Sequence, residues 1–136
     1  MTLVEVVVAF GILAVAALAL IAAFVSGMKL SAHSRDITIA SEVAKQVLER
    51  TRDELRMFGF DCIPAGTYSF DGRAGDFPIG IPPFPPGPYP TTRISDQDYF
   101  VVVTGEEPAP GRLKNVRVDV YWHGNSHVTM ETKFSP

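Results

Sequence analysis

Hydrophobic and polar positions divide this chain into three stretches with different periods. In the first, from Val6 to Val25, all twenty residues are Val, Ala, Phe, Gly, Ile or Leu. A helix of about that length crosses the ~30 Å hydrocarbon core of a bilayer. The pattern therefore predicts a membrane-spanning helix segment over residues 1–28.

The second stretch continues the same helix with an amphipathic pattern. Residues 2–60 contain no proline, and after Lys29 the apolar residues recur three and four positions apart, which aligns them on one face. The predicted buried face consists of Ile37, Ala40, Ala44, Val47, Leu48, Leu55 and Phe58. Gly59 predicts the end of the helix, because glycine commonly closes helices in the left-handed conformation. A single helix from Thr2 to about Met57 would be roughly 80 Å long.

The third stretch carries strand signals separated by turns. Thr67–Phe70 is a short strand candidate, and Tyr99–Thr104 is apolar on both faces, which predicts a central strand covered by the helix. Val116–Trp122 alternates apolar and polar side chains, and residues 128–134 repeat the alternation. Residues 71–90 hold most of the chain's prolines and predict an irregular loop.

The last two strand segments predict a hairpin with a defined register. A three-residue turn at residues 123–125 brings apolar side chains together across the strands, whereas a two-residue turn would oppose them to polar ones. The resulting pairs are Trp122–Ser126, Val120–Val128 and Val118–Met130. The same register sets Arg117 opposite Glu131 and predicts a cross-strand charge pair.

These elements predict an α+β fold with one soluble domain and an anchor. A long N-terminal helix, transmembrane in its first half and amphipathic in its second, packs on an antiparallel sheet of three or four strands. Residues 1–28 form the membrane half, and residues 29–136 form a globular head. The formal net charge of −3, without a basic stripe, argues against a nucleic-acid surface.

Glu5 is the one charged residue in the first 28 positions. A carboxylate close to lipid is costly, from roughly 2.5 kcal/mol upward at the bilayer centre, so its presence indicates a function. An ordinary anchor with a solvated Glu5 at the lipid headgroups is the simpler alternative. Glu5 is therefore the leading candidate for a functional residue.

The start of the chain resembles a known family. Met1-Thr2-Leu3-Val4-Glu5, followed by the apolar run, resembles the mature N-terminus of type IV pilins and type II secretion pseudopilins. In that family a prepilin peptidase cuts after a glycine, and Met1 falls on the first residue of the processed chain. The resemblance covers about the first quarter of the sequence and implies a pilin-like fold. The alternative is that Met1 is an ordinary initiator methionine.

The resemblance implies a filament subunit rather than an enzyme. Met1 would carry an N-methylated amine, and Glu5 would meet the amine of residue one on a neighbouring subunit. Independently of the resemblance, the hydroxyl of Thr2 is expected to cap the start of the helix. The implied partners are other pilin or pseudopilin subunits, the prepilin peptidase and the assembly platform. The chain would reside in the inner membrane and then in an extracellular pilus or a periplasmic pseudopilus.

Two departures from major pilins favour a minor subunit. Major pilins typically carry a proline where this chain has Ala22, so an unbroken helix is expected here. Many also close a C-terminal loop with a disulfide, which the single Cys62 cannot do. We therefore expect a minor pilin, with a minor pseudopilin of a type II secretion system as the alternative. A single-pass anchored binding domain that does not polymerise is a further alternative, and an anchored enzyme is the last.

Other candidate residues carry weaker signals. His123 and His127 lie close across the hairpin turn, but two ligands without a third are usually surface residues. Acids at 71, 76, 96 and 98 lack the spacing of an EF-hand calcium loop. Cys62 is expected as a free buried thiol, with an interchain disulfide as the alternative. No catalytic arrangement or cofactor motif stands out.

The Pro-rich loop supports two interpretations. Phe77, Phe84 and Tyr89 either pack on the sheet or form a docking surface for another subunit, since aromatic side chains are enriched at interfaces.

Overall fold

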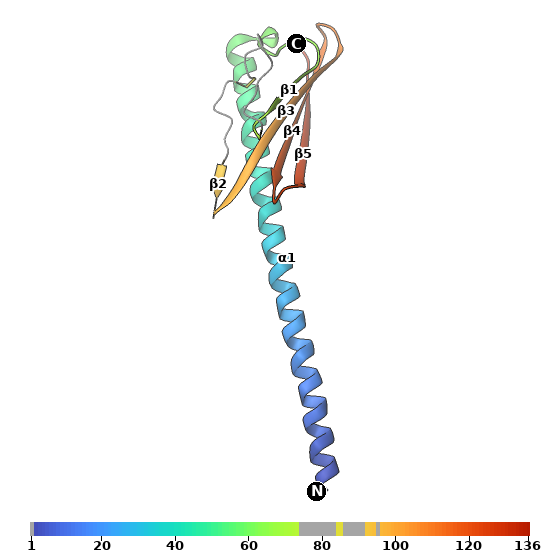
Figure 1. The fold of residues 1–136 in the computed structure, drawn as a ribbon. Coiled ribbons are helices and arrows are strands. Elements are labelled where there is room, and N and C mark those ends of the chain that lie inside the picture. Colours follow the sequence, from blue (N-terminus) through green and yellow to red (C-terminus); the bar gives the residue numbers. More distant parts are fainter. Residues whose placement is uncertain (1, 74–83, 86–91, 95) are drawn as a thin grey trace. The chain divides into compact units, whose positions relative to one another are not determined.

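The computed structural model describes residues 2–73, 84–85, 92–94 and 96–136. Among these residues it contains one long helix, a short 3-10 helix and five strands (Figure 1). They are α1 (Leu3–Phe58), η1 (Phe60–Cys62), β1 (Tyr68–Asp71), β2 (Thr92–Ile94), β3 (Gln97–Ala109), β4 (Leu113–Trp122) and β5 (Ser126–Phe134). The chain falls into two compact units, Met1–Arg35 and Asp36–Pro136. The boundary lies a few residues beyond the one that we drew from hydropathy, at residue 28.

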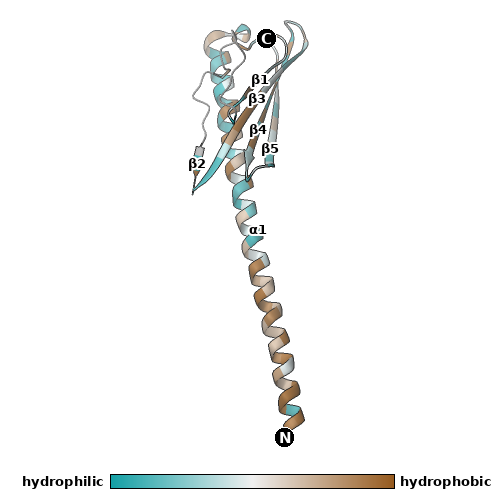
Figure 2. Cartoon of the chain, in the orientation of Figure 1, coloured by the Kyte–Doolittle hydropathy of each residue, from teal (hydrophilic) through white to brown (hydrophobic). Residues whose placement is uncertain are grey.

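The first unit contains the apolar part of α1 and the first residues of its amphipathic part, and every described side chain in it is exposed. The helix runs through Ala22 without interruption, as predicted, and its ends agree with the predicted ones to within one residue. Figure 2 shows that hydrophobic residues predominate along this segment. Because of this segment, α1 is the one helix among the described residues that is long and apolar enough to cross a membrane.

In the second unit, α1 buries one face. The buried residues are Ala40, Val43, Ala44, Val47, Leu48 and Thr51. Thr51 is tolerated there because its hydroxyl donates a hydrogen bond to the Val47 carbonyl oxygen, 3.0 Å away. The predicted face was wrong at both ends, since Ile37 and Phe58 are exposed. Beyond Phe58 the chain turns at Gly59 (φ 81°), and Phe60 and Ile63 supply the apolar contacts at that end of the core.

The sheet of the second unit is antiparallel, with strand order β1-β3-β4-β5 (Figure 1). β2 pairs with the start of β3. The predicted α+β architecture is thus confirmed, with β3 as the central strand. The prediction of three or four strands missed β2, a strand of three residues that follows the Pro-rich stretch and has no alternating pattern of its own.

The β4–β5 hairpin has the predicted register at every position. Trp122 pairs with Ser126, Val120 with Val128 and Val118 with Met130. Arg117 also stands opposite Glu131, but the predicted charge pair between them was wrong. Arg117 instead donates to Asp119 on its own strand at 3.2 Å, and Glu131 accepts from the Asn115 side chain at 2.8 Å. Arg117 pairs with Asp119 because the Asp119 side chain is buried, and an unpaired charge costs more free energy there than at the exposed Glu131.

The core of the second unit lies between the helix and one face of the sheet. Its largest fully buried side chains are Tyr99, Phe70 and Ile63, surrounded by valines of β3 and β4. Phe84 joins this core from within the Pro-rich stretch. The ring of Tyr68 lies directly over Gly105, where an added Cβ would come within 2.0 Å of the ring. A glycine is therefore required opposite Tyr68.

Candidate functional site

The first turn of α1 is held by Thr2. The backbone N–H of Glu5 donates to the Thr2 carbonyl oxygen at 3.0 Å and lies 3.4 Å from the Thr2 hydroxyl oxygen. Thr2 therefore occupies the N-cap position, where a hydroxyl satisfies a helix N–H that has no partner in the preceding turn. This is the capping role expected of Thr2, and it orders the turn that carries Glu5.

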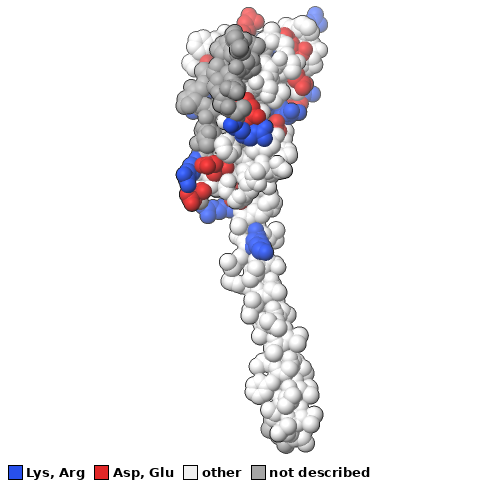
Figure 3. Space-filling view, viewed as in Figure 1, with Lys and Arg blue, Asp and Glu red and all other residues white. Residues whose placement is uncertain are grey.

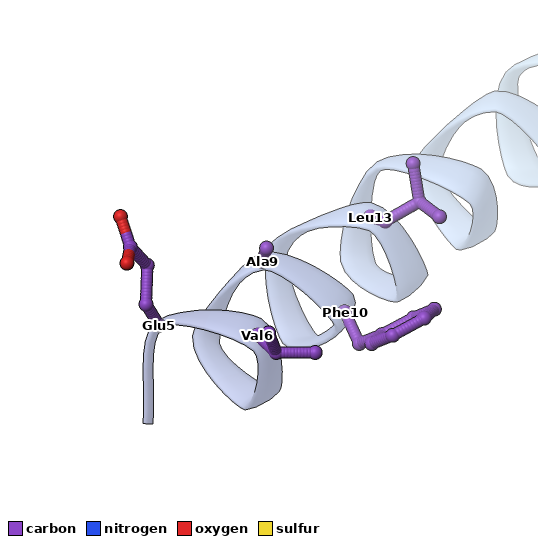
Figure 4. Close-up of a pocket in the computed structure, with 5 residues that line it drawn as sticks. All are labelled: Glu5, Val6, Ala9, Phe10 and Leu13. Atoms are coloured by element: carbon purple, nitrogen blue, oxygen red, sulfur yellow. The ribbon is translucent and has the colours of Figure 1, made fainter. Parts of the chain in front are cut away.

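The Glu5 carboxylate stands at one end of a shallow apolar depression on the helix surface. Val6, Ala9, Phe10 and Leu13 line the rest of it. Figure 4 shows the carboxylate directed away from the helix, with these apolar side chains following it along the next two turns. An acid in the first turn is favoured by the partial positive charge of the helix N-terminus, but that interaction leaves both carboxylate oxygens free to accept from a cation.

This combination defines what the site can do. A depression with an apolar lining can receive apolar side chains, and a carboxylate can accept hydrogen bonds from a positively charged donor. The view in Figure 3 shows both charge signs over the head, whereas the apolar part of α1 is uncharged over most of its length. For a helix that packed along this segment, the charge of Glu5 would thus favour one axial position over the others.

The two histidines of the hairpin are not brought together as a metal pair. His127 stacks on Tyr121, with ring centroids 5.1 Å apart, whereas the His123 imidazole lies 3.5 Å from the carboxylate of Asp36. Among the described residues no three His, Cys, Asp or Glu side chains form a cluster that could hold a metal ion.

The acids considered for calcium are engaged with arginines where they are described. Asp71 accepts three hydrogen bonds from the Arg73 guanidinium, an interaction that raises the pKa of Arg73. Asp96 and Asp98 both lie within ion-pair distance of Arg93. Asp76 lies outside the described residues.

Cys62 is free, but the expectation of a buried thiol was only partly right. Its side chain is half-buried against the core, and burial raises the pKa of the thiol, an effect to which Glu54 adds. A thiol with a raised pKa is a poor nucleophile, because the reactive form is the thiolate.

The structure describes one of the three loop aromatics, and it supports packing in the core. Phe84 is 5% exposed and packs in the core, so its side chain is not part of a docking surface. Phe77 and Tyr89 lie outside the described residues. Of the three candidates, the structure thus accounts for one, by packing.

Two polar side chains that the sequence pattern did not indicate hold the end of the head near the C-terminus of α1. The buried Lys114 amine donates to the carbonyl oxygens of Ile63 at 2.6 Å and Phe60 at 3.3 Å. Glu107 accepts from the backbone N–H groups of Gly111 at 2.8 Å and Gly66 at 3.0 Å, which holds the pKa of its carboxyl below the usual value. Extending the strand alternation back from Val116 would have placed Lys114 on the buried face.

Comparison with known proteins adds no relative: no family model, curated protein or solved structure matches this chain.

Proposed function

We propose that this chain is a non-enzymatic subunit of a type IV pilin-like filament, specifically a minor pilin of a bacterial type IV pilus. Residues 1–28 would anchor it in the inner membrane and later line the apolar centre of the filament. The observation that carries the proposal is a single carboxylate, Glu5, on the first turn of α1. The apolar helix segment that follows it is exposed, because no other described part of the chain covers it.

The exposed apolar surface is the first support for this proposal. A helix with this composition is stable in lipid or among similar helices, but not in water, because each Å² of apolar surface left in water forgoes about 25 cal/mol. Transfer from lipid into a bundle of like helices exchanges one apolar surrounding for another. Such a helix is therefore suited to a subunit that is stored in a membrane and then assembled.

The second support is the electrostatics of Glu5. Once neighbouring helices cover it, an unpaired carboxylate becomes expensive, and an uncompensated buried charge costs about 3–5 kcal/mol. The α-amine of residue one on a neighbouring subunit is the partner that the family resemblance supplies. This amine would lie at the depth of the first turn. Its ion pair with Glu5 would stabilise one axial stagger of the subunits relative to the others.

The first experiment compares Glu5→Gln with a matched control, Glu49→Gln, on the exposed face of α1 in the head. Both variants are expected to reach the membrane at the level of the parent protein. Glu5→Gln should lower recovery in sheared filaments at least about tenfold, since each 1.4 kcal/mol changes an equilibrium tenfold. Glu49→Gln should assemble normally. Normal assembly of Glu5→Gln would overturn the role of Glu5.

Mass spectrometry of the protein from native membranes or filaments tests its processing. An N-methylated Met1, produced from a longer precursor, supports the pilin class. An unmodified initiator Met1, together with absence from sheared filaments, would replace the proposal with an anchored domain that does not polymerise.

A minor pseudopilin of a type II secretion system would use the same residues. Deletion of the gene distinguishes the two systems, since loss of surface pili supports the first and loss of protein secretion supports the second.

A further inference from the structure

The carboxylate of Asp36 on α1 contacts both strand β3 and the β4–β5 turn. Asp36, the first residue of the second unit, has a side chain only 20% exposed. One of its oxygens accepts from the hydroxyl of the fully buried Tyr99 on β3, at 3.2 Å. Its other oxygen lies 3.5 Å from Nε2 of His123, in the turn between β4 and β5. Asp36 thus joins α1 to the sheet at two points.

The turn presents His123 in an unusual backbone conformation. His123 has φ 46° and is followed by Gly124 with φ 81°, and the N–H of Asn125 donates to the His123 carbonyl oxygen at 3.1 Å. Left-handed geometry is uncommon for residues other than glycine, although histidine, asparagine and aspartate adopt it more readily than most. The imidazole is 62% exposed and can exchange protons directly with solvent.

The described titratable groups on the neighbouring elements have other contacts or point elsewhere, apart from those next to Asp36 on α1. On β3, Asp98 and Phe100 flank Tyr99 but point to the opposite face of the strand, and Asp98 lies near Arg93. On the hairpin, His127 stacks against Tyr121. Along α1, the titratable neighbours in sequence are Arg35, which has interactions of its own, and His33.

We propose that Asp36, Tyr99 and His123 form a pH-sensitive latch that fastens the β4–β5 turn to α1 when His123 is protonated. Tyr99 fixes the carboxylate in place, and the imidazolium adds an ion pair that a neutral imidazole cannot make. The added stability is present when the histidine carries its proton and is lost when the imidazole is neutral. The partly exposed histidine limits the size of the effect.

The test uses the full chain in detergent micelles and does not depend on filament assembly. Thermal unfolding is followed at pH 5.5 and pH 8 through Trp122, the chain's single tryptophan, which is buried beside Tyr99. His123→Asn keeps a residue that tolerates the left-handed turn but removes the charge. We expect this variant to lower the Tm by about 1–4 °C at pH 5.5 and by much less at pH 8.

Two further variants separate the latch from a general effect of histidine charge. Asp36→Asn should remove the pH-dependent difference, so that adding His123→Asn to it changes nothing more at pH 5.5. His127→Asn should retain the response of the parent protein. An equal loss for His123→Asn at both pH values, or a normal response in Asp36→Asn, would overturn the proposal.

Discussion

Two parts of the same helix, residues 3–35 and 36–58, meet their surroundings in different ways. Every side chain of the first part is exposed, although this part contains the most hydrophobic run in the chain. The second part is less hydrophobic and buries a face of six residues in the core. The most hydrophobic segment of the helix is therefore not the segment that packs in the core of the protein. It identifies a segment whose stability depends on what surrounds the protein.

The strongest test of this contrast places one truncation in each part of the molecule. Phe70→Ala removes a fully buried ring from the core and should lower the free energy of unfolding of the head by about 3–5 kcal/mol. Leu13→Ala, on the exposed part of α1, should leave head unfolding unchanged. Denaturant unfolding monitored by Trp122 fluorescence measures both. A similar loss for Leu13→Ala would mean that the two units are energetically coupled.

A second pair of variants adds one methyl group to each part. Gly105→Ala should destabilise the head by about 1–3 kcal/mol, because the new Cβ collides with the ring of Tyr68. Gly11→Ala meets no atom within 4 Å and replaces a poor helix former, so it should leave the head unchanged.

Thermal unfolding of the Gly105 variant is repeated in a Tyr68→Ala background to identify the cause of its loss. The penalty of Gly105→Ala should largely disappear there, because the ring that causes the collision is gone. A penalty of the same size in both backgrounds would assign the loss to the backbone of β3 instead.

The smallest effect concerns pH and belongs to the head alone. Hydrogen bonds from Gly111 and Gly66 hold the pKa of the Glu107 carboxyl below its unfolded value. Its stabilisation is therefore present above about pH 4.3 and is lost as the pH falls through the lower, folded value. In Tm measurements between pH 7 and pH 3, Glu107→Gln should unfold at a lower temperature at pH 7 and lose less on acidification. The adjacent, exposed Glu106→Gln should follow the parent protein.

The fold could be predicted from the sequence wherever a period extends over many residues. The helix bounds followed from a proline-free run, and the β4–β5 register followed from side-chain parity, since a shift of one residue would turn the apolar face outward. Phe58 was misassigned because periodicity gives the direction of a helix face, but not where the sheet that covers it ends. Phe84 sits in a stretch without a period, so its burial depends on contacts distant in sequence.

Glu5 could be selected as a candidate from the sequence alone, and its role in assembly stays a prediction. Glu5 is the single charge in an apolar run, so position in the sequence alone identifies it. The contact between Asp36 and His123 carries no such signal, because it joins residues from distant parts of the chain through a turn with an unusual φ. Contacts of that kind depend on the packed tertiary structure.

The free Cys62 has a consequence for how the head reaches its native state. Because no covalent cross-link closes the domain, its folding requires no oxidising catalyst and proceeds equally well under reducing conditions. The same feature removes a reserve of stability, since a native disulfide typically contributes about 2–5 kcal/mol to a small secreted domain. The head is therefore held by noncovalent interactions alone, and substitutions in its core act on the full stability of the domain.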